Sequence, residues 1–143
     1  MERYLYVRSD ESNDYFSDNK AYRFKVHLSL PLFLNGNWKV ALTEFCAVID
    51  SKSRPKTVDA LYIYSDLCKE SIVHGIEQPL LRRLNKNTSK SWDYMLETPY
   101  YLPVKKKEVR EFEIYIKSGD GTFVSDLKEP LQLTLHLKQY PFL

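Results

Sequence analysis

Three histidines and two cysteines are the side chains of this sequence best suited to metal binding or nucleophilic catalysis. His27 and His136 fall on the polar faces of predicted strands, and His74 lies near a predicted strand end. Neither Cys46 nor Cys68 has the neighbouring cysteine or histidine of a zinc site. Short catalytic or phosphate-binding motifs such as HExxH, GxSxG and the P-loop are absent. We therefore predict no catalytic residue, no cofactor and no metal site, and two reduced, buried thiols.

Two charged clusters are candidates for ion or nucleic-acid binding. The acidic residues at 10–18 lack the Asp and Gly spacing of a calcium loop and are interpreted as a solvated loop. The lysines at 105–107, followed by Arg110, could contact the phosphates of packaged DNA, although a solvated turn is the plainer reading. The net charge of +2, from 21 basic and 19 acidic residues, does not itself require a nucleic-acid partner.

Apolar and polar residues alternate with a period of two through most of the chain. The pattern is clearest at 24–30 and 131–138, where every second residue is apolar. A helix would spread these residues around its circumference, whereas a strand collects them on one face. The predicted strands cover residues 3–8, 22–31, 38–48, 60–66, 71–77, 100–105, 110–117, 122–125 and 131–138.

Glycines mark two turns between predicted strands. Gly36, between two asparagines, permits the positive φ of a tight turn, and Gly119 and Gly121 do the same near the C-terminus. Trp38 follows the first turn, and we expect its ring to be buried at one end of the core.

Eight or nine strands with one apolar face each predict a two-layered sandwich, for which a jelly roll is the common eight-stranded solution. We predict an all-β single jelly-roll domain over residues 1–143, the size of one ordinary domain. It comprises an extra N-terminal strand and loop at 1–21, a core at 22–138 and a C-terminal tail at 139–143.

In this arrangement the strands at 22–31 and 131–138 are central neighbours in one sheet. His27 and His136 would then lie near each other on the outer face. A weak metal or pH-sensitive site is one reading of that pair, and two solvated histidines is the plainer one.

Glu44 is a candidate for a subunit interface. It shares one side of its strand with Val40 and Leu42, so we expect it to point partly inward. An inward carboxylate needs a hydrogen-bonding partner. A loop backbone and a neighbouring subunit are the two candidates for that partner.

The loop at 85–98 and the C-terminal tail supply the other interface candidates. The loop is polar but carries Trp92 and Tyr94, and we expect it to face outward and to bind. Phe142 and Leu143 leave an apolar tail that docks either on its own sheet or on a neighbouring subunit.

Four collinear segments carry a resemblance to a known family. The run from Leu34 to Glu44 has the pattern Leu-x-Gly-x-Trp-x-Val-x-Leu-x-Glu, and the other segments lie at 24–31, 61–82 and 99–137. In order and spacing the chain resembles the minor capsid (penton) proteins of Polinton/Maverick elements and the related adintoviruses. The resemblance implies a jelly roll, homopentamers at icosahedral vertices, a major capsid protein as partner and an enclosed double-stranded DNA genome. It implies no catalytic residues.

The sequence thus predicts a structural, self-assembling shell protein and not an enzyme. No apolar run reaches about 18 residues and no signal-peptide core is present, so we expect no membrane contact. Synthesis is expected in the host cytoplasm, with assembly there or in the nucleus and a final location in the virion. The alternatives are a host-adopted or nucleoplasmin-like oligomeric binding module of the same fold, and a cupin-type metalloenzyme.

Overall fold

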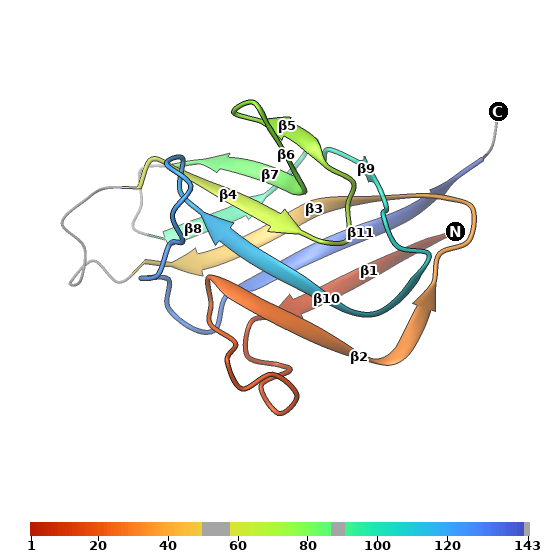
Figure 1. Cartoon of the computed structure of the whole chain (residues 1–143), viewed down its shortest axis with the longest axis horizontal. Coiled ribbons are helices and arrows are strands. Elements are labelled where there is room, and N and C mark those ends of the chain that lie inside the picture. Colours follow the sequence, from red (N-terminus) through yellow and green to blue (C-terminus); the bar gives the residue numbers. More distant parts are fainter. Residues whose placement is uncertain (50–57, 87–90, 142–143) are drawn as a thin grey trace.

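The computed structural model describes residues 1–49, 58–86 and 91–141, in which every regular element is a β-strand (Figure 1). The all-β prediction is confirmed, with 62% of residues in strands and none in helices. The strands are β1 (Glu2–Arg8), β2 (Arg23–Phe33), β3 (Asn37–Val48), β4 (Ala60–Ser65), β5 (Ser71–Val73), β6 (Ile76–Gln78), β7 (Leu80–Asn85), β8 (Ser91–Met95), β9 (Leu102–Pro103), β10 (Glu108–Lys117) and β11 (Gln132–Tyr140).

Two antiparallel sheets contain the long strands (Figure 1). The first sheet has the order β1-β11-β3-β8, with β9 also paired to β3, and the second has the order β2-β10-β4-β7. The strand pairs β1·β11, β2·β10, β3·β8 and β4·β7 join the two ends of the chain and proceed inward. The chain therefore pairs as one long hairpin wound into two layers.

The core lies between the two sheets and is filled by the inward side chains of each alternating strand. On β10 the buried positions Phe112, Ile114 and Ile116 alternate with more exposed ones, as the sequence predicts. Full burial of one such side chain stabilises the fold by about 1.5–3 kcal/mol. The largest side chains that are almost completely buried are Phe24, Leu42, Phe45, Leu61, Ile63, Leu67, Leu81, Trp92, Phe112, Ile114, Ile116 and Leu131.

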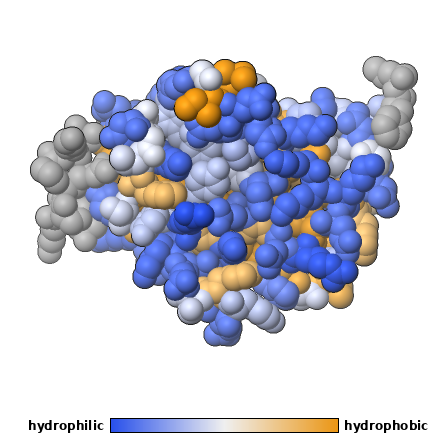
Figure 2. Space-filling view, in the orientation of Figure 1, coloured by the Kyte–Doolittle hydropathy of each residue, from blue (hydrophilic) through white to orange (hydrophobic). Residues whose placement is uncertain are grey.

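The β5–β6 hairpin packs over the outer face of β4. Tyr62, Tyr64 and Val73 form a second buried cluster there, so β4 is buried on both of its faces. The hairpin in turn leaves Ile72 and Ile76 exposed at 68% and 63%. Figure 2 shows the resulting hydrophobic tip above an otherwise mostly hydrophilic face.

The predicted strand order is wrong in two respects. β1 is not an extra strand, because it is the partner of β11 over seven residue pairs. β2 is not a neighbour of β11 and lies instead at the edge of the second sheet. Both differences follow from strand pairing that begins at the two chain ends and proceeds inward. In this order the first strand, β1, pairs with the last, β11, and β2 pairs with β10.

Local strand predictions fail where the period of two is interrupted. The predicted strand at 71–77 is a hairpin, since His74 and Gly75 both have positive φ, at 50° and 82°. The segment 122–125 makes only one isolated bridge, between Lys117 and Phe123. Only Leu102–Pro103 of the segment 100–105 is a strand.

β2 is irregular at its second half. Val109 faces Leu32 and Glu111 faces His27, so a bulge lies between these pairs. The alternation from Phe24 onward predicts an inward Leu30, but that side chain is 78% exposed because the bulge breaks the register.

The predicted turn glycines differ in conformation. Gly36 and Gly121 have positive φ, at 100° and 86°, as their turns require. Gly36 connects strands of different sheets, and the buried Trp38 beside it donates its indole N–H to the Asn35 carbonyl at 3.0 Å. Gly119 does not have positive φ. There the turn is held by Asp120, whose carboxylate accepts the Thr122 backbone N–H at 3.0 Å.

Candidate functional site

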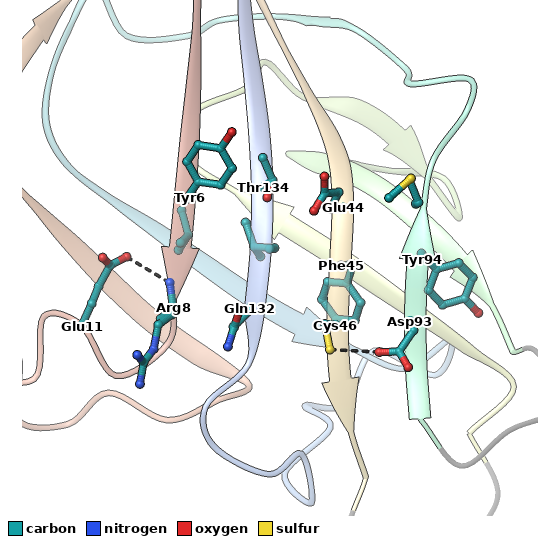
Figure 3. Close-up of a pocket in the computed structure, with 13 residues that line it drawn as sticks. Tyr6, Arg8, Glu11, Glu44, Phe45, Cys46, Asp93, Tyr94, Gln132 and Thr134 are labelled. Carbon is teal, nitrogen blue, oxygen red and sulfur yellow. Dashed lines mark hydrogen bonds between the residues drawn. The ribbon is translucent and has the colours of Figure 1, made fainter.

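A groove lies on the outer face of the first sheet, where β1, β11, β3 and β8 run side by side (Figure 3). Three of its lining residues, Val7, Phe45 and Leu133, are buried core positions, and most of the others are polar, apart from the exposed Tyr6 and Met95. The residues that line it are Tyr6, Val7, Arg8, Glu11, Glu44, Phe45, Cys46, Asp93, Tyr94, Met95, Gln132, Leu133 and Thr134.

A bulge in β3 turns Glu44 into this groove. Thr134 faces Glu44 and the next residue of β11, Leu135, faces Leu42, so Thr43 has no counterpart in the register. The extra residue reverses the alternation, and Glu44 becomes exposed while Phe45 becomes buried. The prediction that Glu44 points inward is therefore wrong, and the groove carries its carboxylate instead.

Cys46 and Asp93 form the closest polar contact in the groove. The thiol donates to the Asp93 carboxylate, with 2.9 Å between Sγ and Oδ1. This hydrogen bond, then partial burial and the negative charge of Asp93, raise the pKa of Cys46. The prediction of a buried thiol is wrong for Cys46, which is exposed, and holds for Cys68. Because the Cys46 thiol stays protonated near neutral pH, it acts as a hydrogen-bond donor and not as a nucleophile.

The charge of the groove is negative. Arg8 does not offset the carboxylates of Glu44 and Asp93, because its guanidinium forms a bidentate pair with Asp10, at 3.0 and 3.1 Å. Glu11 accepts the backbone N–H of Arg8 at 3.1 Å, and burial raises its pKa. A cationic side chain is therefore the kind of group that this groove accommodates.

The two aromatic candidates of the 85–98 segment occupy different places. The loop prediction is wrong over Ser91–Met95, which form β8. The Trp92 ring is 2% exposed in the core and offers almost no surface to a neighbouring subunit. Tyr94 lines the groove and donates its hydroxyl to the Asn85 carbonyl.

His136 is the centre of a second polar cluster on the same outer face. It is 6% exposed, because Tyr4 stacks on its ring with 4.4 Å between centroids. Its Nδ1 lies 2.8 Å from the Tyr101 hydroxyl, and its Nε2 lies 3.0 Å from Glu2 Oε2. The prediction of a solvated histidine is wrong here, because side chains from β1 and from the segment before β9 cover it.

The chain Tyr101–His136–Glu2 has the hydroxyl–imidazole–carboxylate order of a nucleophile and its base. Its chemistry differs, because burial raises the pKa of Tyr101 and the phenol remains protonated. Because the Glu2 carboxylate can only accept, Nε2 carries a proton, and in the neutral ring Nδ1 then accepts a hydrogen bond from the Tyr101 hydroxyl. The cluster ties β1 to β11 and to residue 101.

The predicted proximity of His27 and His136 is not found. His27 lies on β2 in the second sheet, where its ring stacks on Tyr15 with 4.0 Å between centroids. Within the described residues, no group of three or more His, Cys, Asp or Glu side chains is placed to hold a metal ion.

Three of the four basic residues at 105–110 are paired with carboxylates. Lys106 binds Asp66 at 2.9 Å and Arg110 binds Glu108 at 2.7 Å, while Lys105 pairs with Glu70. The pairing reduces the net positive charge that this cluster presents. Phe142 and Leu143 lie outside the described residues.

Sequence reasoning missed the Cys46–Asp93 contact and the role of Tyr101. One signal for the first was present: the alternation after Leu42 breaks at Glu44 and resumes with Phe45, as it does at a bulge. No sequence pattern indicates that Tyr101 meets His136, since the contact joins segments 35 residues apart.

Comparisons with known proteins do not assign a family. No protein-family model matches the sequence, and no curated protein matches it significantly. In the part of the chain that the structure describes, no helix is long and apolar enough to cross a bilayer.

Proposed function

We propose that this chain is a single jelly roll. The strand order carries the proposal. When the eight long strands are counted along the chain, they pair first with eighth, second with seventh, third with sixth and fourth with fifth. Two sheets built from such nested pairs make the double-sheet arrangement that viral capsid and lectin domains share.

We further propose that the protein is a structural subunit of an icosahedral shell, assembling as a homopentamer at the vertex. The same strand order is the main support, together with the resemblance of residues 22–138 to Polinton/Maverick penton proteins. A major capsid protein of the same element would be its partner, and the virion its location. The mechanism is buried area and shape at subunit contacts, so no catalytic residue is required.

Exposed apolar side chains support a role in assembly. Large hydrophobic residues on a monomer surface mark protein contacts when they gather on one element. β2 and the β5–β6 hairpin each expose two of them, and the groove exposes two more. These residues are Leu30 and Phe33, Ile72 and Ile76, and Tyr6 and Met95.

Electron microscopy of the purified full chain tests the vertex proposal. Class averages with five-fold rings are the expected result. Single particles of one chain only, at concentrations where shell proteins assemble, would contradict it.

One observation favours a second function, that of an oligomeric binding module for basic partners. Glu11, Glu44 and Asp93 come from separate segments but share one groove, which supplies the acidic surface that a nucleoplasmin-like chaperone needs. Titration with a lysine- and arginine-rich peptide tests this function. Binding that is lost in the Glu44→Gln/Asp93→Asn variant would support it, and no binding at low salt would exclude it.

A further inference from the structure

β1 and β2 are edge strands of the two sheets, but their edges are treated differently. The edge of β2 is covered by the segment that precedes it. Asn19 both donates to the Lys25 carbonyl and accepts the Lys25 N–H, each at 2.9 Å. Ser12 accepts the His27 N–H at 2.9 Å. These side chains take the hydrogen bonds that an added strand would need.

The edge of β1 is open by contrast. Ser9 N–H donates to the Leu131 carbonyl, and Gln139 N–H donates to the Met1 carbonyl. In the antiparallel pattern, the backbone groups of the odd-numbered residues of β1 therefore form the hydrogen bonds to β11. The backbone groups of the even-numbered residues point away from the sheet. The Arg8 N–H donates to the Glu11 carboxylate. The backbone N–H groups of Glu2, Tyr4 and Tyr6 have no hydrogen-bond partner among the described residues.

The sequence of β1 is complementary to itself in the antiparallel direction. With Leu5 on a two-fold axis, Tyr4 faces Tyr6 of a second copy. In the same register Glu2 faces Arg8 of that copy. Arg8 already pairs with Asp10 and Glu2 already bonds His136, so this position adds no repulsion and the tyrosine pairs and the open backbone carry the contact. Tyr4 and Tyr6 are positions whose N–H and C=O groups point outward, as a hydrogen-bonded pair requires. Their rings are 50% and 75% exposed, and an aromatic pair across strands is stabilising.

We propose that β1 pairs with β1 of a second copy of this chain, joining the two first sheets into one continuous antiparallel sheet across a two-fold axis. The contact is isologous and closes after two subunits. It differs from the ring contact of the proposed function and would join two copies whether or not a ring forms. In a shell of rings it would link one ring to another.

A disulfide trap tests the register. Leu5 would face Leu5 of the second copy as a non-hydrogen-bonded pair, with Cα atoms about 4.5 Å apart, a separation that a disulfide spans. The test uses the full chain with Cys46→Ser, which leaves only the buried Cys68. Leu5→Cys is expected to form a covalent dimer on mild oxidation. Arg3→Cys is the matched control and is expected not to, because residue 3 faces residue 7 of the second copy.

A proline block tests the strand addition without a new thiol. Tyr6→Pro removes an outward N–H and leaves the hydrogen bonds to β11 in place, since proline is tolerated on edge strands. Sedimentation is expected to show that Tyr6→Pro loses the two-fold association and that Tyr6→Ala largely retains it. Equal association in both variants would overturn the proposal, as would equal crosslinking of Leu5→Cys and Arg3→Cys.

The outcomes separate this contact from the vertex ring. A five-fold mass without Leu5→Cys crosslinking rejects the β1 contact and keeps the ring. A covalent dimer of an otherwise monomeric chain rejects the ring and keeps the β1 contact.

Discussion

Leu42 and Glu44 are two residues apart on β3, yet Leu42 points into the core and Glu44 points out of it. An uninterrupted strand would place both on one face. The bulge at Thr43, opposite the step from Thr134 to Leu135, separates them. Because of this bulge, the exposed residues Glu44 and Cys46 line the groove on the outer face of the sheet.

Truncation of these two residues should have very different effects on stability. Leu42→Ala is expected to lower the free energy of unfolding by about 2–5 kcal/mol, because it leaves a cavity in the core. Glu44→Ala should change it by no more than about 0.5 kcal/mol, as at other surface positions. Urea unfolding of both variants measures the difference. A large loss for Glu44→Ala would show that its carboxylate is inward after all.

Regular strands could be predicted from sequence because their period is local. The buried positions Phe112 on β10 and Leu135 on β11 follow from the alternation, although Thr134 and His136 on the other face of β11 are buried as well. The partner of β11 could not be predicted, because apolar and polar residues alternate in both β1 and β2. Only the long-range pairing in the folded chain distinguishes the two strands. The short β8 lies in a polar segment whose composition predicts an exposed loop, although the Trp92 side chain is buried in the core.

The polar contacts of the candidate site were less predictable than the strands. His136 does lie on the outer face of its strand, as the alternation indicates. Its burial depends on Tyr4 and Tyr101, which reach it from other segments, and a periodicity argument carries no information on such cover.

The reactivity of Cys46 should increase when its hydrogen-bond acceptor loses charge. Asp93 raises the pKa of the Cys46 thiol, so Asp93→Asn should lower that pKa and increase the thiolate fraction at pH 8. The rate of modification by a disulfide reagent is expected to rise several-fold in the variant. Glu44→Gln, a neutralisation in the same groove, is the control and should have a smaller effect. An unchanged rate in Asp93→Asn would show that the 2.9 Å contact is not maintained in solution.

Alkaline pH should destabilise the fold through Cys68. Burial raises the pKa of this thiol from 9.0 to about 12. The unfolded chain therefore ionises first, and stability that is complete below pH 9 is lost as the pH rises toward 12. The loss from this group is about 1.4 kcal/mol for each pH unit.

The Cys68→Ala variant isolates this contribution. Burial also raises the pKa of Tyr64 and Tyr115, so both proteins should lose stability at high pH, but the variant less steeply. The measurement is the free energy of unfolding at several pH values from 8 to about 11. Parallel curves for the two proteins would contradict the buried thiol.

Removal of the His136 ring should loosen β1. His136→Ala leaves Tyr101 and Glu2 without their hydrogen-bond partner and uncovers Tyr4, at an expected cost of about 1–3 kcal/mol. Hydrogen exchange should accelerate first along β1 and β11. His27→Ala is the control, since that ring lies on the other sheet, where it stacks on Tyr15. Equal losses in the two variants would argue against a tie between β1 and β11.

The mass of the purified full chain in solution tests self-assembly most directly. Light scattering or sedimentation over a range of concentrations should give five times the 16.9 kDa of one chain, or a multiple of that ring. A mass of one chain at every concentration would contradict a subunit that assembles with copies of itself.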